Sequence, residues 1–253
     1  MARKSGLPFQ EKTPGVLVHC AYHKMGTIWL TQLLRGIASK FDMTLEISNN
    51  NGDRHNGSDI LIANHSQLCL EDLGDYVGSH MIRDPRDAVV SAYYYHLWTD
   101  EAWVHQKSEQ YGGRSYQEFL NGMNEEEGLA EEIRRFETYI QHYRLQEWDY
   151  QNPRILEIRY ESLIADEQTE FRKLFEHYGF SESAIKDSLE LAESLSFKNV
   201  AKRKLGAKKS KSHLRSGKPN QWVEILNSSH RQLVKSLWGD LLIQMGYEND
   251  LDW

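Results

Sequence analysis

Residues 16–30 (VLVHCAYHKMGTIWL) place Lys24, Gly26 and Thr27 between a short apolar run and the start of a helical pattern. The first N–H groups of a helix lack carbonyl partners and carry a partial charge of roughly +0.5, which favours a phosphate group. Gly26 lets the backbone approach such an anion closely, Thr27 offers a hydroxyl, and Lys24 adds a positive charge. A Walker sequence instead has its lysine after the second glycine. The segment therefore predicts an anion site of another kind, and a helix start beside a surface lysine is the alternative.

A second pair of polar residues lies further along the chain. Arg83 directly follows the apolar run 78–82 (GSHMI), and Ser91 lies about two turns into the helical pattern that comes next. Open α/β sheets bind ligands outside the carboxyl ends of their strands, so both side chains are placed to hold a second phosphate. For Arg86 and Asp87 we expect a local salt bridge instead.

The elements that must position these residues alternate along the chain. Short apolar runs predict strands at 16–22, 43–47, 59–63, 78–82 and 154–159. Helical spacing predicts helices at 27–38, 84–98, 129–148, 166–178, 182–194 and 229–245, with an irregular aromatic segment at 98–127. Alternating strands and helices predict an α/β fold with a central parallel sheet flanked by helices. We expect one domain over residues 16–253, after an N-terminal tail at 1–15.

Composition narrows the class of protein. The net charge of −7 argues against a general nucleic-acid binder, and two cysteines form no disulfide framework. The sequence has neither a signal-peptide apolar core nor an apolar run long enough to span a membrane. We therefore expect a soluble, cytoplasmic protein with no nucleic-acid partner.

Positive charge is concentrated in residues 202–218 (KRKLGAKKSKSHLRSGK), which hold eight Lys or Arg and no Asp or Glu. One interpretation is a solvated loop. The other is a flap that closes over a polyanionic ligand.

The two polar segments together resemble motifs of the cytosolic-type sulfotransferases that use 3′-phosphoadenosine 5′-phosphosulfate (PAPS). The pattern KxGTxW corresponds to residues 24–29, and RDPRDxxxS corresponds to residues 83–91. In that family the first motif binds the 5′-phosphosulfate and the second binds the 3′-phosphate. The resemblance thus implies PAPS as co-substrate, adenosine 3′,5′-bisphosphate (PAP) as product, and no metal. It assigns nucleotide contacts to Lys24, Met25, Gly26, Thr27, Ile28, Trp29, Arg83 and Ser91.

Three further segments follow in the order that the family has. Tyr160 lies in a turn similar to the family's YED turn, whose tyrosine contacts adenine. The pair 196–197 is similar to a Thr-Ser-Phe stretch on the base, and 215–217 with Trp222 resembles the RKGxxxxW loop on the 3′-phosphate. Trp29 matches the position that stacks on adenine, with a core tryptophan as the alternative. The resemblance adds Tyr160, Ser196, Phe197, Arg215, Ser216 and Gly217 as nucleotide contacts.

The sequence departs from the family at several positions. His23 and Met25 replace a proline and a serine beside the lysine, and Ile28 removes a hydroxyl that the family aims at the 5′-phosphate. The late loop reads RSG, with Lys218 close enough to replace the missing charge. The family's dimerisation motif is not found after Trp222, so the oligomeric state is left open.

His65 is the candidate general base. It directly follows the predicted strand 59–63, and an imidazole titrates near neutral pH. The family's catalytic histidine lies in a Lys-x-His segment at a comparable place, which reads Ala-Asn-His here. A loop histidine with no catalytic role is the alternative, and His80, inside a predicted strand, is expected to be a packed core residue. The rival histidines are His23, His80 and His96.

We therefore predict a sulfotransferase that moves the sulfuryl group of PAPS to a hydroxyl or amine of a small organic acceptor by in-line transfer. Lys24 would offset charge on the bridging oxygen and His65 would take the acceptor's proton. A P-loop-like nucleotide kinase or NTPase and a non-catalytic polyanion-binding module using 202–218 are the alternatives. Trp98 and Trp103 belong to an aromatic cluster that either lines an acceptor pocket or packs in a core.

Overall fold

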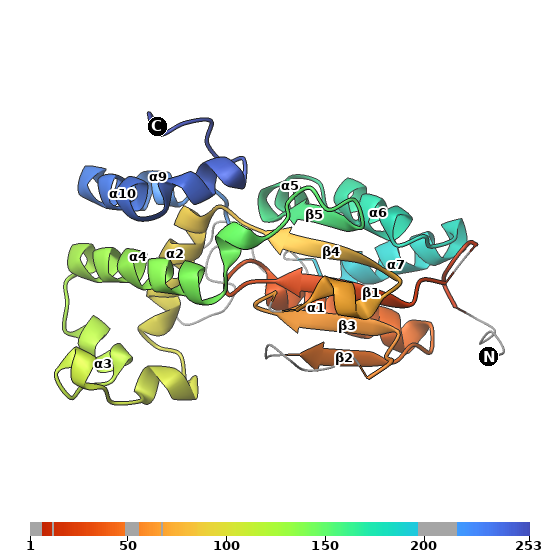
Figure 1. Ribbon diagram of the computed structural model, residues 1–253, viewed down its shortest axis with the longest axis horizontal. Helices are drawn as coiled ribbons and strands as arrows, with labels where there is room; N and C mark the ends of the chain where they lie inside the picture. Colours follow the sequence, from red (N-terminus) through yellow and green to blue (C-terminus); the bar gives the residue numbers. More distant parts are fainter. Residues whose placement is uncertain (1–6, 12, 49–55, 67, 197–216) are drawn as a thin grey trace. The chain divides into compact units, whose positions relative to one another are not determined.

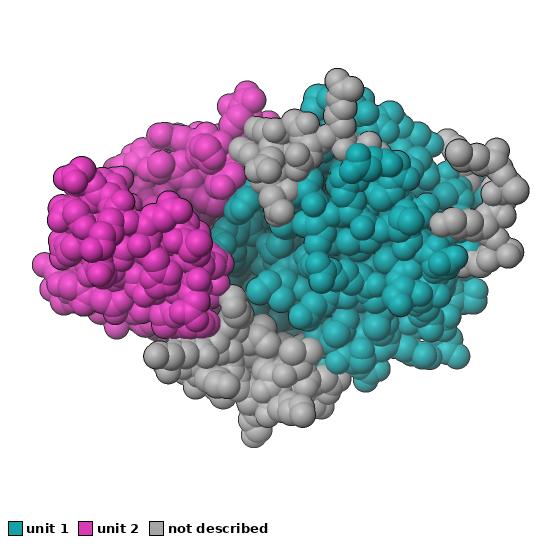
Figure 2. Space-filling view, turned by 90° about the horizontal axis from the view of Figure 1, so that it is seen from below, with its two compact units in different colours: residues 1–83, 149–203 teal, residues 84–148, 204–253 magenta. Residues whose placement is uncertain are grey.

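The structure, a computed structural model, describes residues 7–11, 13–48, 56–66, 68–196 and 217–253 (Figure 1). The chain folds into two compact units (Figure 2). Unit 1 consists of residues 1–83 and 149–203, and unit 2 consists of residues 84–148 and 204–253.

Unit 1 contains a parallel sheet of five strands in the order β2-β3-β1-β4-β5 (Figure 1). The strands are β1 (Val16–Ala21), β2 (Leu45–Ser48), β3 (Ile60–Asn64), β4 (Tyr76–Ile82) and β5 (Ile155–Arg159). All six residues of β1 are buried, as expected of a central strand covered on both faces. The predicted α/β class with a central parallel sheet flanked by helices is confirmed.

Helices of unit 1 pack on one face of this sheet. They are α1 (Thr27–Lys40), α5 (Tyr160–Ala165), α6 (Glu167–His177) and α7 (Glu182–Ser194), and a short 3₁₀ turn, η1, spans Leu70–Leu73. One hydrophobic cluster joins Leu17 of β1 to Leu33 of α1, Phe175 of α6 and Ile185 of α7. The buried face of α1 has the helical spacing that the sequence predicted.

The second strand begins later than predicted. Residue 43 was expected to be its first residue, but the Met43 amide donates to the Ala38 carbonyl at 2.9 Å and so still closes the end of α1. The Thr44 amide then donates to the Asp59 carboxylate at 2.7 Å, and the strand follows at Leu45.

Unit 2 is helical in its described part. It contains α2 (Pro85–His96), α3 (Tyr116–Asn121), α4 (Glu125–His142), α9 (Trp222–Ile225) and α10 (Ser228–Gln244), with 3₁₀ turns η2 (Ala102–His105), η3 (Glu109–Tyr111) and η4 (Leu145–Glu147). The start of α2 is as predicted, because Asp84 accepts the Arg86 amide as N-cap and Pro85 occupies the first turn.

Capping residues explain two errors in the predicted helices of unit 2. The helix expected at 129–148 begins four residues earlier, because Asn124 and Glu127 form a capping box. It ends at His142, just before Arg144 adopts a positive φ of 54°. The segment expected to be irregular contains α3, which a second capping box of Ser115 and Glu118 begins.

The aromatic residues of unit 2 pack against one another. Trp103 stacks on Tyr116 at a centroid distance of 5.7 Å, and the Arg135 guanidinium lies over both rings. Trp98 meets Tyr95 edge-on at 5.2 Å. The core alternative therefore describes Trp103, which belongs to a hydrophobic cluster with Val90.

Three buried polar side chains are linked by hydrogen bonds on the face of the sheet that the helices of unit 1 cover. His19 Nδ1 lies 2.8 Å from Ser79 Oγ, which lies 2.7 Å from the Tyr178 hydroxyl. Burial, with a smaller effect of nearby His80, lowers the pKa of His19 from 6.5 to about 3. His19 is therefore neutral in the folded protein at neutral pH.

This depressed pKa predicts acid sensitivity of folding. Between about pH 6.5 and 3 the unfolded chain binds a proton at His19 that the folded chain does not, so stability falls as pH falls. The loss approaches about 1.4 kcal/mol per pH unit for one proton. Urea unfolding at pH 7.5 and pH 5 measures it: the wild type should lose more stability than His19→Gln over this interval. Equal losses in the two proteins would contradict the assignment to His19.

Candidate active site

The register of the sheet brings the ends of four strands to one edge of unit 1. Ala21 of β1 pairs with Asn64 of β3 and with Met81 of β4, and Ile82 of β4 pairs with Arg159 of β5. The residues that follow these four strands are Tyr22, His65, Arg83 and Tyr160. Three of the four were predicted as site residues, so strand ends far apart in sequence supply the same edge.

The turn between β1 and α1 has the backbone of an anion-binding loop. Gly26 precedes α1 with φ 94° and ψ 8° and provides no side-chain cap. A Cβ at Gly26 would lie 2.5 Å from Met81 Cε, so both the backbone conformation and the available space favour glycine. The first turn of α1 contains no acidic residue. Its N-terminal amides therefore face no carboxylate of their own turn, which suits a phosphate.

Side chains of this loop have divided roles. The Thr27 hydroxyl donates to the Tyr22 carbonyl at 2.9 Å, and the Met25 amide donates to the same oxygen at 3.2 Å. Both bonds close the turn on itself. Met25 is fully buried, whereas the Ile28 side chain is 51% exposed at the start of α1. Among the departures of this loop from the family motif, Met25 is buried in the core and Ile28 presents apolar surface.

Arg83 joins the loop to the start of α5. Its guanidinium lies 4.6 Å from the centroid of the Tyr160 ring, and Nη1 donates to the Lys24 carbonyl at 3.4 Å. Arg83 is 6% exposed and Tyr160 is 8% exposed. The structure thus brings together three residues that the sequence placed in the site from three separate motifs. The stacking of arginine on tyrosine was not predicted, because no local pattern connects the two.

His65 lies in a strained turn at the same edge. It follows β3 with φ 61°, and Ser66 follows with φ 52°. Two consecutive non-glycine residues in the left-handed region are uncommon, and such strain concentrates at functional sites. His65 is half-buried. The structure therefore places it at the carboxyl edge, as expected from the sequence.

His80, one of the rival histidines, is a packed strand residue as predicted. It is fully buried in β4, with Nδ1 2.8 Å from Glu157 Oε2. His96, another rival, is also buried, with Nδ1 2.9 Å from Glu132 Oε2 in unit 2. Burial by itself would raise the pKa of Glu132, but His96 and Tyr116 outweigh it and the pKa is lowered.

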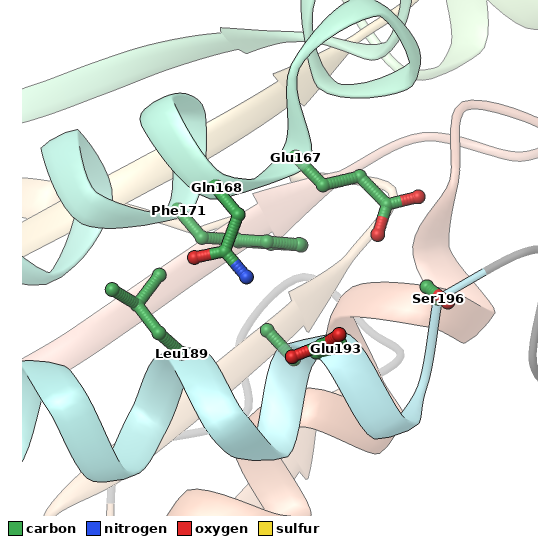
Figure 3. A pocket seen from close by; sticks show the side chains of 7 residues that line it. Glu167, Gln168, Phe171, Leu189, Glu193 and Ser196 are labelled. Atoms are coloured by element: carbon green, nitrogen blue, oxygen red, sulfur yellow. The ribbon is translucent and has the colours of Figure 1, made fainter.

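A cavity of about 300 Å³ lies between α6 and α7, and Figure 3 shows side chains from both helices facing it. Its lining is Glu167, Gln168, Phe171, Leu189, Ala192, Glu193 and Ser196. The Trp29 ring meets the Phe171 ring edge-on at a centroid distance of 5.5 Å. Phe171 and Ser196 both line the cavity, so Phe171 connects two predicted base contacts, Trp29 and Ser196. Phe171 was missed because its spacing is that of any buried position on an amphipathic helix.

Other predicted contacts lie in unit 2 or outside the described residues. Ser91 is half-buried in α2, and Gly217 adopts φ 68°. Phe197, Arg215 and Ser216 lie outside the described residues, as does the basic segment as far as residue 216.

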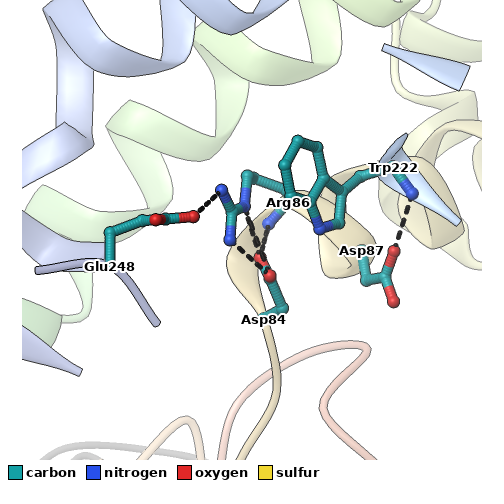
Figure 4. A network of polar contacts seen from close by, with 5 residues as sticks. All are labelled: Asp84, Arg86, Asp87, Trp222 and Glu248. Atoms are coloured by element: carbon teal, nitrogen blue, oxygen red, sulfur yellow. Dashed lines mark hydrogen bonds and ion pairs between the residues drawn. The ribbon is translucent and has the colours of Figure 1, made fainter. Parts of the chain in front are cut away.

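The expected local salt bridge of Arg86 is confirmed, with Nη2 2.8 Å from Asp84 Oδ2. Arg86 also pairs with Glu248, far along the chain (Figure 4). Asp87 has a different partner from the one expected: its carboxylate accepts the Trp222 backbone amide at 2.9 Å. Sequence reasoning missed Glu248 because this contact joins residues 162 positions apart.

Two searches of the described part of the chain were negative. In these residues no group of three or more His, Cys, Asp or Glu is placed to hold a metal ion. Over the same residues, no helix combines the length and apolar character needed to cross a membrane.

Comparison with known families decides the assignment. A sequence model described as the sulfotransferase domain matches residues 80–246, which is more than half of the chain. The chain belongs to the sulfotransferase domain family. Its general activity is therefore sulfuryl transfer. A comparison with curated protein sequences finds no match.

Solved structures of a mouse sulfotransferase and of retinol dehydratase share the fold. A mouse sulfotransferase complexed with PAP has a TM-score of 0.55 at 14% identity, covering 95% of this chain and 94% of that one. Retinol dehydratase with androsterone and inactive cofactor PAP has a TM-score of 0.51 at 14% identity, over 93% and 83% of the two chains. Retinol dehydratase in a complex with retinol and PAP has a TM-score of 0.51 at 14% identity, covering 91% of this chain and 82% of that one. At this identity the likeness concerns the fold alone.

Proposed function

We propose that this sulfotransferase moves the sulfuryl group of PAPS to a hydroxyl or amine of a small organic acceptor. The observation that carries the proposal is the junction of Lys24, Arg83 and Tyr160 beside the uncapped start of α1. Two cationic side chains and a helix N-terminus at one sheet edge suit a ligand with several negative charges. PAP in the structures of similar fold agrees with such a ligand.

The 5′ end of PAPS belongs, in this proposal, to the turn that Gly26 closes. The amides at the start of α1 neutralise non-bridging oxygens, because Gly26 lets the ligand approach the backbone. The Thr27 hydroxyl donates to the Tyr22 carbonyl, so Thr27 serves the ligand through its amide in this conformation. Ile28 contributes its amide as well, while its side chain contributes no hydrogen bond.

Sulfuryl transfer requires bond exchange at sulfur, removal of a proton from the acceptor, and stabilisation of negative charge on the leaving oxygen. The acceptor oxygen or nitrogen forms a bond to sulfur as the bond from sulfur to the bridging oxygen breaks. His65 takes the proton that the acceptor loses, and PAP leaves with the electron pair on the former bridging oxygen. The Lys24 ammonium offsets the charge that grows there, and such preorganised electrostatics commonly supplies the largest share of catalysis. Positioning of the two reactants supplies much of the rest.

Aromatic and polar residues around α6 and α7 suit the base of the nucleotide. Trp29 packs on Phe171, and Ser196 lies at the cavity that Phe171 lines. Tyr160, held by Arg83, is the third described residue that the family resemblance assigns to adenine. We include Phe197 with them, and assign Arg83, Ser91, Arg215, Ser216 and Gly217 to the 3′-phosphate.

The same proposal takes the sulfotransferase domain as residues 16–253. β1 and the Gly26 turn precede the matched residues 80–246, yet β1 pairs with β4 in the same sheet. A domain without residues 16–79 would lose the central strand and the loop assigned to the phosphosulfate.

Ligand specificity provides the first test. PAP should raise the melting temperature well above the effect of ATP with magnesium, because binding to the folded state stabilises it by about 2.7 kcal/mol at a ligand concentration of 100 Kd. Differential scanning fluorimetry over a PAP concentration series measures this. Greater stabilisation by ATP with magnesium would favour a kinase or NTPase, and none by either nucleotide would favour a polyanion-binding module.

Two substitutions separate binding from chemistry. Lys24→Ala should lower turnover by about 10²-fold or more, as the loss of a charge-stabilising donor does. His65→Ala should abolish turnover and leave the Kd for PAP nearly unchanged, because the base contacts the acceptor's proton. Turnover with labelled PAPS and calorimetric PAP binding measure the two effects, with the exposed His105→Ala as control. Normal turnover of His65→Ala would assign the base to another residue.

A further inference from the structure

Arg86 is enclosed by aromatic rings and carboxylates within unit 2. The guanidinium carbon lies over both the Trp222 and the Trp253 ring, 3.7 Å and 4.5 Å from their centroids, and the two rings meet edge-on at 5.7 Å. Nε and Nη2 donate to Asp84 at 2.9 and 2.8 Å, and Nη1 donates to Glu248 (Figure 4). Arg86 is only 2% exposed. We call these five residues the Arg86 cluster.

The cluster controls how residue 222 lies against the start of α2. Arg86 stacks on the Trp222 ring, and Asp87 accepts the Trp222 amide at 2.9 Å. Asp84, which also belongs to the cluster, caps α2 by accepting the Arg86 amide. Ring and backbone of Trp222 are thus both held by the first turn of α2.

Trp222 closes a turn that begins at Gly217. Gly217 and Asn220 adopt positive φ angles of 68° and 60°, and Gln221 Nε2 donates to the Lys218 carbonyl at 2.7 Å. A turn built from left-handed residues keeps its shape only where the surrounding contacts hold it. The contacts that hold its last residue, Trp222, come from Arg86 and Asp87.

Glu248 and Trp253 complete the cluster from a segment to which neither the sequence motifs nor the sulfotransferase match gives a role. A buried guanidinium is stable where carboxylates pair with it and flat rings cover its faces. Without Trp253, Arg86 loses one of its two ring contacts and the Trp222 ring loses its edge-on partner, so the stacking of Arg86 on Trp222 loosens. The Gly217–Trp222 turn then loses the orientation that α2 imposes on it.

We propose that Trp253 and Glu248 are positioning residues for the 3′-phosphate of the nucleotide. They act through Arg86 and Trp222 on the turn that begins at Gly217, and through Asp84 on the helix that carries Ser91. The inference rests on the proposed function, which assigns the 3′-phosphate to Ser91 and Gly217. It predicts that Glu248 and Trp253 set the preference for PAP over AMP, since AMP lacks the 3′-phosphate.

Calorimetric Kd values for PAP and AMP test this in the full chain. Trp253→Ala should weaken PAP binding about tenfold, the scale of a lost desolvated cation–π contact, and should change AMP binding less than about twofold. Trp253→Phe, which keeps a ring over Arg86, should recover most of the PAP affinity. Glu248→Gln keeps the size of the side chain and should also raise the Kd for PAP, by a smaller factor. This variant provides the test if Trp253→Ala fails to fold.

Leu251→Ala is the matched control from the same segment. Leu251 is 42% exposed and its Cδ2 lies against Gly239 of α10. This variant should bind both nucleotides as the wild type does. Equal weakening of PAP and AMP in Trp253→Ala and Glu248→Gln would mean a purely structural role, and unchanged PAP affinity would also overturn the inference. A wild type that binds neither nucleotide overturns the proposed function as well.

Discussion

Arg83 stacks its guanidinium on Tyr160 and reaches the Lys24 carbonyl, and this contact joins the ends of three neighbouring strands. It is possible because β1, β4 and β5 run parallel and in register, so their carboxyl ends share one edge. Residues 24, 83 and 160 come from separate motifs of the sequence. The parallel sheet brings these three residues close together at one edge, and His65 follows β3 at the same edge.

Charge is concentrated at this edge without a carboxylate in the first turn of α1 to neutralise it. Lys24 and Arg83 supply full positive charges, and the start of α1 supplies partial charge from its amides. Gly26 is favoured because its φ of 94° strains any other residue, and a Cβ at this position would also displace the end of the Met81 side chain. An anion is the ligand that best neutralises this positive charge, and a nucleotide with several phosphate or sulfate groups neutralises more of it.

Local sequence patterns predicted the parts of the site that local chemistry determines. Buried strands, the Gly26 turn, the Asp84 cap and Arg83 at a strand end all follow from short-range rules, and each lies where expected. The start of α4 was wrong although its capping box was readable, because helical spacing was given more weight than Asn124 and Glu127.

Contacts between distant segments were beyond prediction from one sequence. Phe171 beside Trp29, and Glu248 and Trp253 around Arg86, join positions whose pairing depends on the completed fold. Their residue types were compatible with an ordinary core or surface. Periodicity indicates that such a residue is buried, and only the folded chain identifies its partner.

Proteins of this family transfer sulfuryl groups, and we propose that in this protein PAPS is the donor, bound at the edge where Arg83 reaches Lys24. Incubation with PAPS labelled in the sulfuryl group and a panel of phenols, alcohols, sterols and amines tests it most directly. We expect label in at least one acceptor, with PAP formed in equal amount and no requirement for added magnesium. Label that stays in PAPS across the whole panel, or transfer that is unchanged in Lys24→Ala, would contradict it.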